Sequence, residues 1–114
     1  MNDVLHGTVV VAIGGREFTL KPTLEAALKI ERRFGGLRPA YDSVRLLSID
    51  ALAHVIAAGA RLKEDEAEAL PEKIFSEGVG GVTAQVMPFL GALLSPTPKS
   101  VAEQGNVEAA STAQ

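Results

Sequence analysis

The order of apolar and polar positions begins with two short extended segments. Residues 8–13 are rich in β-branched side chains, and residues 16–20 alternate polar with apolar ones. Two glycines stand between them and can adopt the positive φ angles of a two-residue hairpin turn. Phe18 and Leu20 fall on one face of the second segment. Because two strands alone are marginal in water, we expect this face to pack against helices.

A helix is predicted next, over residues 24–34. Thr23 is a suitable N-cap, Glu25 stands in the first turn where the helix dipole favours an anion, and a pair of glycines ends the helix. Its apolar positions share one side of a helical wheel. They are Leu24, Ala27, Leu28, Ile30 and Phe34.

Two further helices are predicted in the middle of the chain. Residues 39–47 favour a short helix, and Ser48 is a typical cap for the next one, which carries Asp50 in its first turn. Its buried stripe is supplied by Ile49, Leu52, Val55, Ile56 and Leu62. The intervening positions are mostly alanine or glycine. They make this helix thin and let another helix approach it closely.

Two polar side chains in this region require an interpretation. Glu31 falls inside the apolar arc of the first helix, where it either lies partly exposed at the edge or pairs with Arg38 or Arg45. His54 lies across from the buried stripe of its helix, and no second histidine or carboxylate follows three or four residues on. We therefore expect His54 to be a solvated side chain and not a metal ligand or general base.

Charge is distributed unevenly along the chain. Residues 64–77 carry six acidic side chains against Lys73 alone, whereas residues 16–45 carry seven basic and four acidic ones. This polarity is either an ordinary solvated surface or a means of steering association with a partner. Within the acidic stretch, Pro71 predicts the first turn of a short helix that ends at Gly78.

The last predicted helix spans about residues 82–94, after a glycine-rich turn at 78–81. Pro88 lies inside it and removes a backbone hydrogen bond to Ala84, so a kink or a break is expected there. The fold class is therefore α+β and mainly α: an N-terminal hairpin packed on about four helices. We expect one domain over residues 1–94 and a disordered tail over 95–114.

Composition narrows the function. The chain has 114 residues, a formal net charge of -3, no cysteine and two histidines, and it lacks the motifs of nucleotide-binding and hydrolytic sites. We expect no enzyme activity, no cofactor, no bound metal and no nucleic-acid partner. The uncharged stretch 78–98 is too polar to span a membrane, and the N-terminus has no secretory pattern, so a cytoplasmic location is expected.

What remains is apolar contact with another protein. The last helix presents a broad apolar face with Val86, Phe89, Leu90 and Leu93, and the thin helix adds small residues around Ala57 and Ala60. These six residues are the candidate partner-binding set, and we expect some of them to be exposed in the monomer. The alternative is that the face of the last helix is simply core.

One stretch carries a resemblance to a known family. Residues 20–26, with Pro-Thr-x-Glu-Ala at 22–26, run into Ile30-Glu31 and a glycine break. This arrangement resembles the gene transfer agent family of phage-tail proteins, which is grouped with phage tail assembly chaperones. The similarity covers about residues 7–94. It implies a non-enzymatic protein of a bacterial host or prophage that binds the tape measure protein before tail-tube subunits polymerise around it.

Other functions stay open at this point. A structural component of the particle, such as a tail-tube or head–tail joining subunit, is the main alternative. A nucleic-acid-binding regulator using Arg32, Arg33, Arg38 and Arg45 is a third, although the overall acidity argues against it. Self-association into a homo-oligomer is compatible with each of them.

Overall fold

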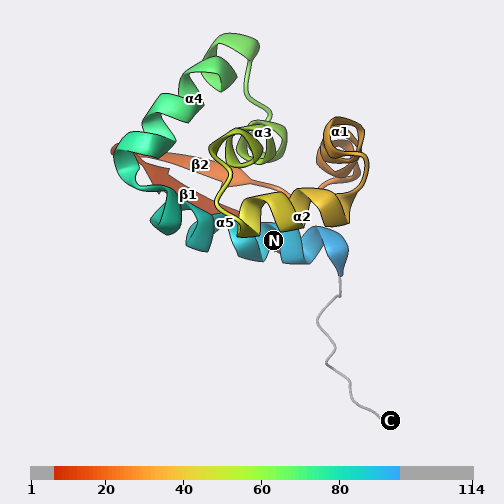
Figure 1. Cartoon of the computed structure of the whole chain (residues 1–114). Helices are drawn as coiled ribbons and strands as arrows, with labels where there is room; N and C mark the ends of the chain where they lie inside the picture. The colour runs from red at the N-terminus through yellow and green to blue at the C-terminus, as the bar shows by residue number, and fades with distance from the viewer. Residues whose placement is uncertain (1–6, 96–114) are drawn as a thin grey trace.

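The computed structural model describes residues 7–95 (Figure 1). An antiparallel hairpin is followed by helices. The elements are β1 (Val9–Ile13), β2 (Arg16–Leu20), α1 (Leu24–Phe34), α2 (Leu37–Arg45), α3 (Ile49–Ala60), α4 (Glu64–Glu77) and α5 (Val79–Leu94). The α+β, mainly α class is thereby confirmed. The predicted C-terminal tail begins at Ser95, and its remaining residues lie outside the described part.

The hairpin has the predicted turn and the predicted buried face. Gly14 and Gly15 both have positive φ, 60° and 82°, as a two-residue turn requires. The register pairs Val11 with Phe18, and the side chains of both are buried. The opposite face is open to solvent, and Val10 on it is 51% exposed.

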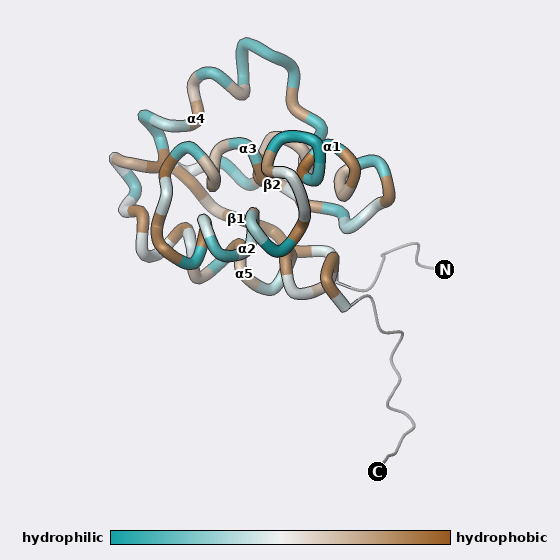
Figure 2. The backbone as a smooth tube through the Cα atoms, turned by 45° about the vertical axis from the view of Figure 1, so that its right-hand side comes forward, coloured by the Kyte–Doolittle hydropathy of each residue, from teal (hydrophilic) through white to brown (hydrophobic). Residues whose placement is uncertain are grey.

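The helices enclose the inner face of the hairpin (Figure 1). α5 runs along β1 and also packs against α2, α3 packs on β2, and α1 and α4 flank α3 on opposite sides. The largest buried side chains come from all of these layers. They include Leu20, Ile30, Leu52, Ile56, Ile74 and Phe89. Figure 2 shows the N-terminal part of α4 as largely hydrophilic, which matches its place at the outside of the fold.

Local signals set the helix starts as expected. The Thr23 hydroxyl accepts a hydrogen bond from the Ala26 amide, and the Ser48 hydroxyl accepts one from the Ala51 amide, each at 3.1 Å. Gly35 ends α1 with φ 83°, in the left-handed region. One expectation for α1 is wrong: Leu24 is 74% exposed, because the helix turns Ala26 and Ile30 to the core.

Two predicted boundaries in the C-terminal half are wrong. α4 does not begin at Pro71 but at Glu64, and Pro71 lies inside it. Three acidic residues in the first turn of α4 stabilise this start, because they interact favourably with the positive end of the helix dipole. Leu70 and Ile74, on either side of the proline, are buried and hold the helix against the core.

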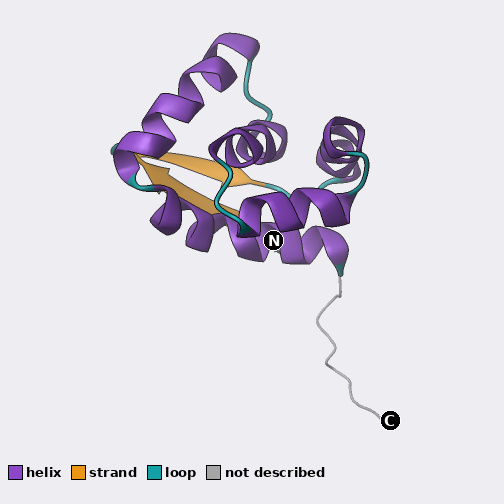
Figure 3. Cartoon of the chain, viewed as in Figure 1, coloured by secondary structure: helices purple, strands orange, loops and turns teal. Residues whose placement is uncertain are grey.

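α5 likewise begins earlier than predicted. It starts at Val79, so Gly80 and Gly81 are helical and not part of a turn. The helix also continues through Pro88 without a break (Figure 3). Pro88 and Ala84 are both exposed, so water is available to the Ala84 carbonyl that loses its backbone donor. No helix within residues 7–95 is long and apolar enough to cross a membrane.

Candidate protein-binding groove

The structure places half of the candidate partner-binding residues in the core. Val86 and Phe89 are fully buried and Leu90 is 1% exposed, so for these three the alternative that the face is core holds. The physical reason is that the apolar face of α5 is used up by packing against β1 and α2. Leu93, near the end of α5, is half-buried against this core.

The two alanines of the set lie elsewhere. Ala57 and Ala60 are half-buried on α3. Ala57 stands on the outward side of α3, three residues after His54 and seven after Asp50, which places all three on one helical face. Because α1 and α4 rise on either side of α3 (Figure 1), this face has a hollow on each side and is not a flat surface.

The larger of the two hollows lies between α3 and α4. It has a volume of about 420 Å³. Its lining combines small apolar side chains with charged ones: Ala53, Ala57, Ala67 and Pro71 on the one hand, and Asp50, His54, Glu64 and Glu68 on the other. We call this the α3–α4 groove. It exists because alanines on both helices leave the space that larger side chains would fill.

A smaller hollow of about 210 Å³ lies on the other side of Ala57, between α3 and α1. Lys29 and Arg33 of α1 line it, together with Leu62. His54 and Ala57 border both hollows and form the ridge between them. The α3 face therefore has an acidic wall on the α4 side and a basic wall on the α1 side.

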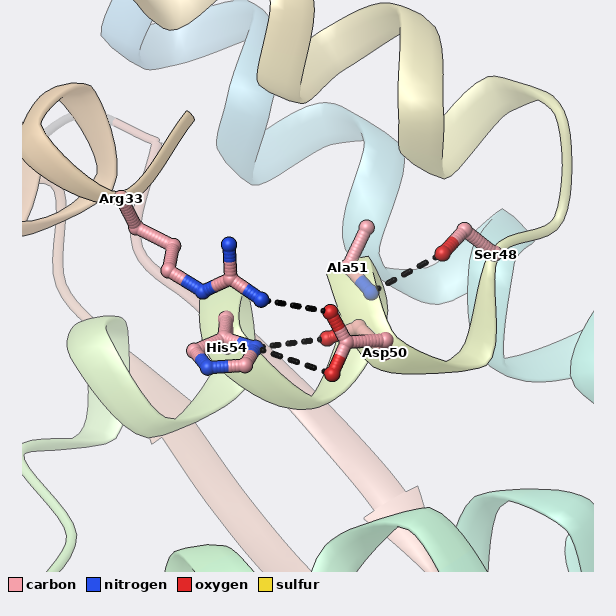
Figure 4. Close-up of polar contacts among 5 residues, drawn as sticks. All are labelled: Arg33, Ser48, Asp50, Ala51 and His54. Atoms are coloured by element: carbon pink, nitrogen blue, oxygen red, sulfur yellow. Dashed lines mark hydrogen bonds and ion pairs between the residues drawn. The ribbon is translucent and has the colours of Figure 1, made fainter. Parts of the chain in front are cut away.

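A polar cluster at the ridge fixes the position of His54 (Figure 4). The Nδ1 atom of His54 lies 2.9 Å from the Asp50 carbonyl oxygen, and since a carbonyl only accepts, Nδ1 carries the proton. The Asp50 carboxylate lies 3.5 Å from the same nitrogen and accepts a hydrogen bond from Arg33 at 2.8 Å. The rings of His54 and Phe34 are also perpendicular to each other, with their centroids 6.3 Å apart. His54 is thus half-exposed, as expected of a solvated side chain, but it is oriented by its neighbours.

The acidic side chains of α4 are largely uncompensated within residues 7–95. Of these carboxylates, Glu66 alone has an ion pair in that range, with Arg16 of β2 at 3.0 Å. The hydrogen bond from Arg16 holds the pKa of Glu66 below its ordinary value, and a backbone hydrogen bond from Lys63 adds to this. Glu64 and Glu68, which border the groove, have no such partner there.

The remaining sequence candidates are placed as follows. Glu31 is exposed and forms no ion pair within residues 7–95, so it lies at the edge of the stripe. Arg33 pairs with Asp50, and Arg38 pairs with Asp42 of its own helix. Among the described residues, no group of three or more histidine, cysteine or acidic side chains is arranged to hold a metal.

Three groove residues fall outside the helix that the sequence predicts. Ala67, Glu64 and Glu68 precede Pro71, which predicts the first turn of that helix, whereas α4 begins at Glu64. The signal that could have found them is the run of three acidic residues before Ala67, which is typical of a helix N-terminus.

Comparison with known proteins gives no family. No protein-family model, no curated protein and no solved structure matches this chain. The resemblance to phage-tail proteins therefore stays a prediction from the sequence.

Proposed function

We propose that this chain is a non-enzymatic assembly chaperone of a phage-like tail, and that it holds an apolar helix of the tape measure protein in the α3–α4 groove. The resemblance in residues 20–31 supports the class of protein. The observation that carries the binding mode is the pair of alanines, Ala57 and Ala67, that line an open, partly apolar hollow between two helices.

The groove has the chemistry to accept a helix. Alanines on α3 and α4 let a third helix come close to both, as in the ridge-into-groove packing of helices. The carboxylates of Asp50, Glu64 and Glu68 border the apolar part. A matching client helix therefore carries a stripe of small apolar side chains with lysine or arginine beside it.

Such a contact suits a transient role. A chaperone of tail assembly must release its client when tube subunits polymerise around it. A single groove of this volume with a polar border gives an interface at the small end of the range, where complexes are weak and exchange quickly. Charge on the border raises the rate of encounter without adding much to residence time.

The test is co-expression of this chain with the neighbouring genes of its native operon, followed by purification of the complex with a tape measure protein. Ala57→Glu places a long charged side chain in the groove without lowering helix propensity much. We expect it to abolish co-purification of the tape measure protein. Ala84→Glu, on the exposed side of α5, is the matched control and should co-purify as the unaltered chain does. Equal co-purification of both variants would contradict the proposal.

Mass spectrometry of purified particles separates the chaperone from a structural subunit. A chaperone is absent from finished particles or present in much less than one copy per tail ring. A tail-tube or head–tail joining subunit is present in a fixed number of copies, and that result would replace the proposed function with the structural one.

A further inference from the structure

A second surface of interest is the outer edge of the hairpin. The side-chain amide of Gln85 on α5 forms hydrogen bonds with both backbone groups of Ala12. The Ala12 N–H donates to Oε1 of Gln85 at 2.8 Å, and Nε2 of Gln85 donates to the Ala12 carbonyl oxygen at 3.2 Å. In an antiparallel pair, the N–H and C=O of one residue point to the same side and alternate along the strand. Ala12 therefore points both groups away from β2.

The register then fixes the backbone of β2. Ala12 is paired with Glu17, and Val10 with Thr19. Because these are the pairs that exchange no hydrogen bonds, Glu17 and Thr19 also turn their N–H and C=O groups outward, to the free edge of β2. By the same alternation, the backbone N–H of Lys21 also points outward, and it donates to the Gly59 carbonyl oxygen at 3.1 Å. The end of α3 therefore occupies the edge of β2 at Lys21.

The two sheet edges thus differ. α5 lies along the edge of β1, and Gln85 satisfies Ala12 in the manner of a neighbouring strand. On the edge of β2, within residues 7–95, Glu17 and Thr19 have no hydrogen-bond partner for their outward backbone groups, and both residues are exposed. Short strands and charged side chains are the usual means of blunting such an edge, and β2 has both, so a segment that adds here has to match its charges.

A cleft of about 300 Å³ lies beside this edge, between β2 and the end of α3. Phe18, Ala60 and Leu62 provide apolar side chains along it. In a strand added to β2, the residue opposite Phe18 projects to the same side of the sheet as Phe18, toward this cleft. An apolar side chain is favoured at that position.

The charges along the edge specify the flanking positions. Lys21 and Arg61 border the cleft at one end, and Glu17 lies at the other. Lys21 has no ion pair in the described part of the chain. In an antiparallel added strand, an acidic residue opposite Thr19 lies diagonal to Lys21, and a basic residue lies directly opposite Glu17.

We propose that the free edge of β2 binds an extended segment of a partner protein by antiparallel strand addition, with the side-chain order acidic, apolar, basic. Glu17 and Thr19 supply four backbone hydrogen bonds, and the cleft takes the apolar side chain. This surface is separate from the α3–α4 groove and requires a strand where the groove requires a helix. The proposal therefore does not rest on the proposed function.

A second copy of this chain fits the edge less well. Pairing β2 with β2 of another copy places Phe18 opposite Phe18, and this side chain is 3% exposed in its own core. It is not available to enter the cleft of the other copy. A partner segment with a free apolar side chain has no such conflict.

The test titrates the whole chain with the synthetic peptide acetyl-Thr-Glu-Val-Lys-Thr-amide and follows backbone amide resonances by NMR. We expect saturable shifts at Glu17 and Thr19, with a Kd on the order of 1 mM for so short a strand. The peptide acetyl-Thr-Lys-Val-Glu-Thr-amide has the same composition with its charges exchanged. It should bind about fivefold more weakly, because two favourable cross-strand pairs become unfavourable.

A pair of proline variants identifies the edge. Thr19→Pro removes an outward N–H and should abolish the shifts, since proline is tolerated at a free edge but cannot donate there. Val10→Pro makes the same change on the edge of β1 and should leave peptide binding intact. Circular dichroism shows whether the two proline variants are folded. If neither variant folds, Lys21→Glu replaces them, since it leaves the backbone unchanged and should weaken binding of the first peptide.

Three results would overturn the proposal. The first is the absence of shifts at about 10 mM peptide. The second is equal binding of the two peptides together with shifts on the β1 side. The third is slow hydrogen exchange of the Glu17 and Thr19 amides before peptide is added, which would show that another copy or the residues outside 7–95 already occupy the edge.

Discussion

Gly59 of α3 lies where the ring of Phe89 of α5 crosses the helix. A Cβ atom on Gly59 would stand 2.9 Å from the tip of the Phe89 ring and 3.1 Å from the Cβ of Leu20. All three residues are buried. The glycine therefore sets how closely α3, α5 and β2 approach one another at the centre of the core.

Gly59→Ala is expected to destabilise the protein. The added methyl group has to displace a buried ring or a strand, which costs about 1–3 kcal/mol and outweighs the roughly 1 kcal/mol that alanine adds in helix propensity. Chemical denaturation measures the change. Gly81→Ala is the matched control: Gly81 is exposed inside α5 with nothing near the added atom, so this variant should gain stability. A stabilised Gly59→Ala would contradict the packing described here.

Phe89→Ala tests whether this face of α5 is core. Because the Phe89 side chain is fully buried, its removal should lower the free energy of unfolding by about 3–5 kcal/mol. Loss of client binding is then expected only as a consequence of unfolding. A variant that keeps its melting temperature and loses its client would show instead that the ring is exposed in solution.

Gln85→Ala removes both hydrogen bonds to Ala12. Gln85 lies 73 residues from Ala12 and ties α5 to β1, so its loss should cost about 1–2 kcal/mol and speed hydrogen exchange of the Ala12 amide. Gln85→Glu is the informative comparison. A carboxylate still accepts from the Ala12 N–H but places a negative oxygen against the Ala12 carbonyl, so this variant should not restore stability. Full stability of Gln85→Glu would mean that the second bond contributes nothing.

The pair of Arg16 and Glu66 predicts a pH dependence. Its hydrogen bond lowers the pKa of Glu66 in the folded state below the value of the unfolded chain. The stability that it contributes is therefore complete above the unfolded pKa of about 4.5 and is lost as the pH falls through the lower, folded value. Glu66→Gln should remove this part of the acid dependence. Melting curves of both proteins from pH 7 down to about pH 3 measure it, and parallel curves would refute the assignment.

Local signals explain why some elements are predictable. Thr23 caps the start of α1 and Gly35 caps its end, and both residue types have a strong preference for these positions. The predicted bounds of α1 therefore agree with the structure. The hairpin is equally local, since its turn is set by two glycines. In α4 the local signal of Pro71 was misleading, because burial of Leu70 and Ile74 holds the helix together across the proline.

The candidate site depends on contacts that no local pattern contains. An apolar helix face such as the one with Phe89 has the same sequence pattern whether it packs in its own core or binds a partner. Only the position of β1 against α5 shows that this face is core. The α3–α4 groove likewise forms because Ala57 and Ala67 come from two helices that happen to lie side by side. The sequence shows the small residues of α3, but it does not show which helix forms the opposite wall.

Hydrogen exchange of the chain, alone and saturated with the tape measure protein that co-purifies with it, tests the central claim most directly. Binding in the α3–α4 groove predicts slower exchange confined to α3 and to the first half of α4, with α5 and the hairpin unchanged. Protection centred on the end of α5 around Leu93, or no protection at α3, would contradict the claim that this groove holds the client.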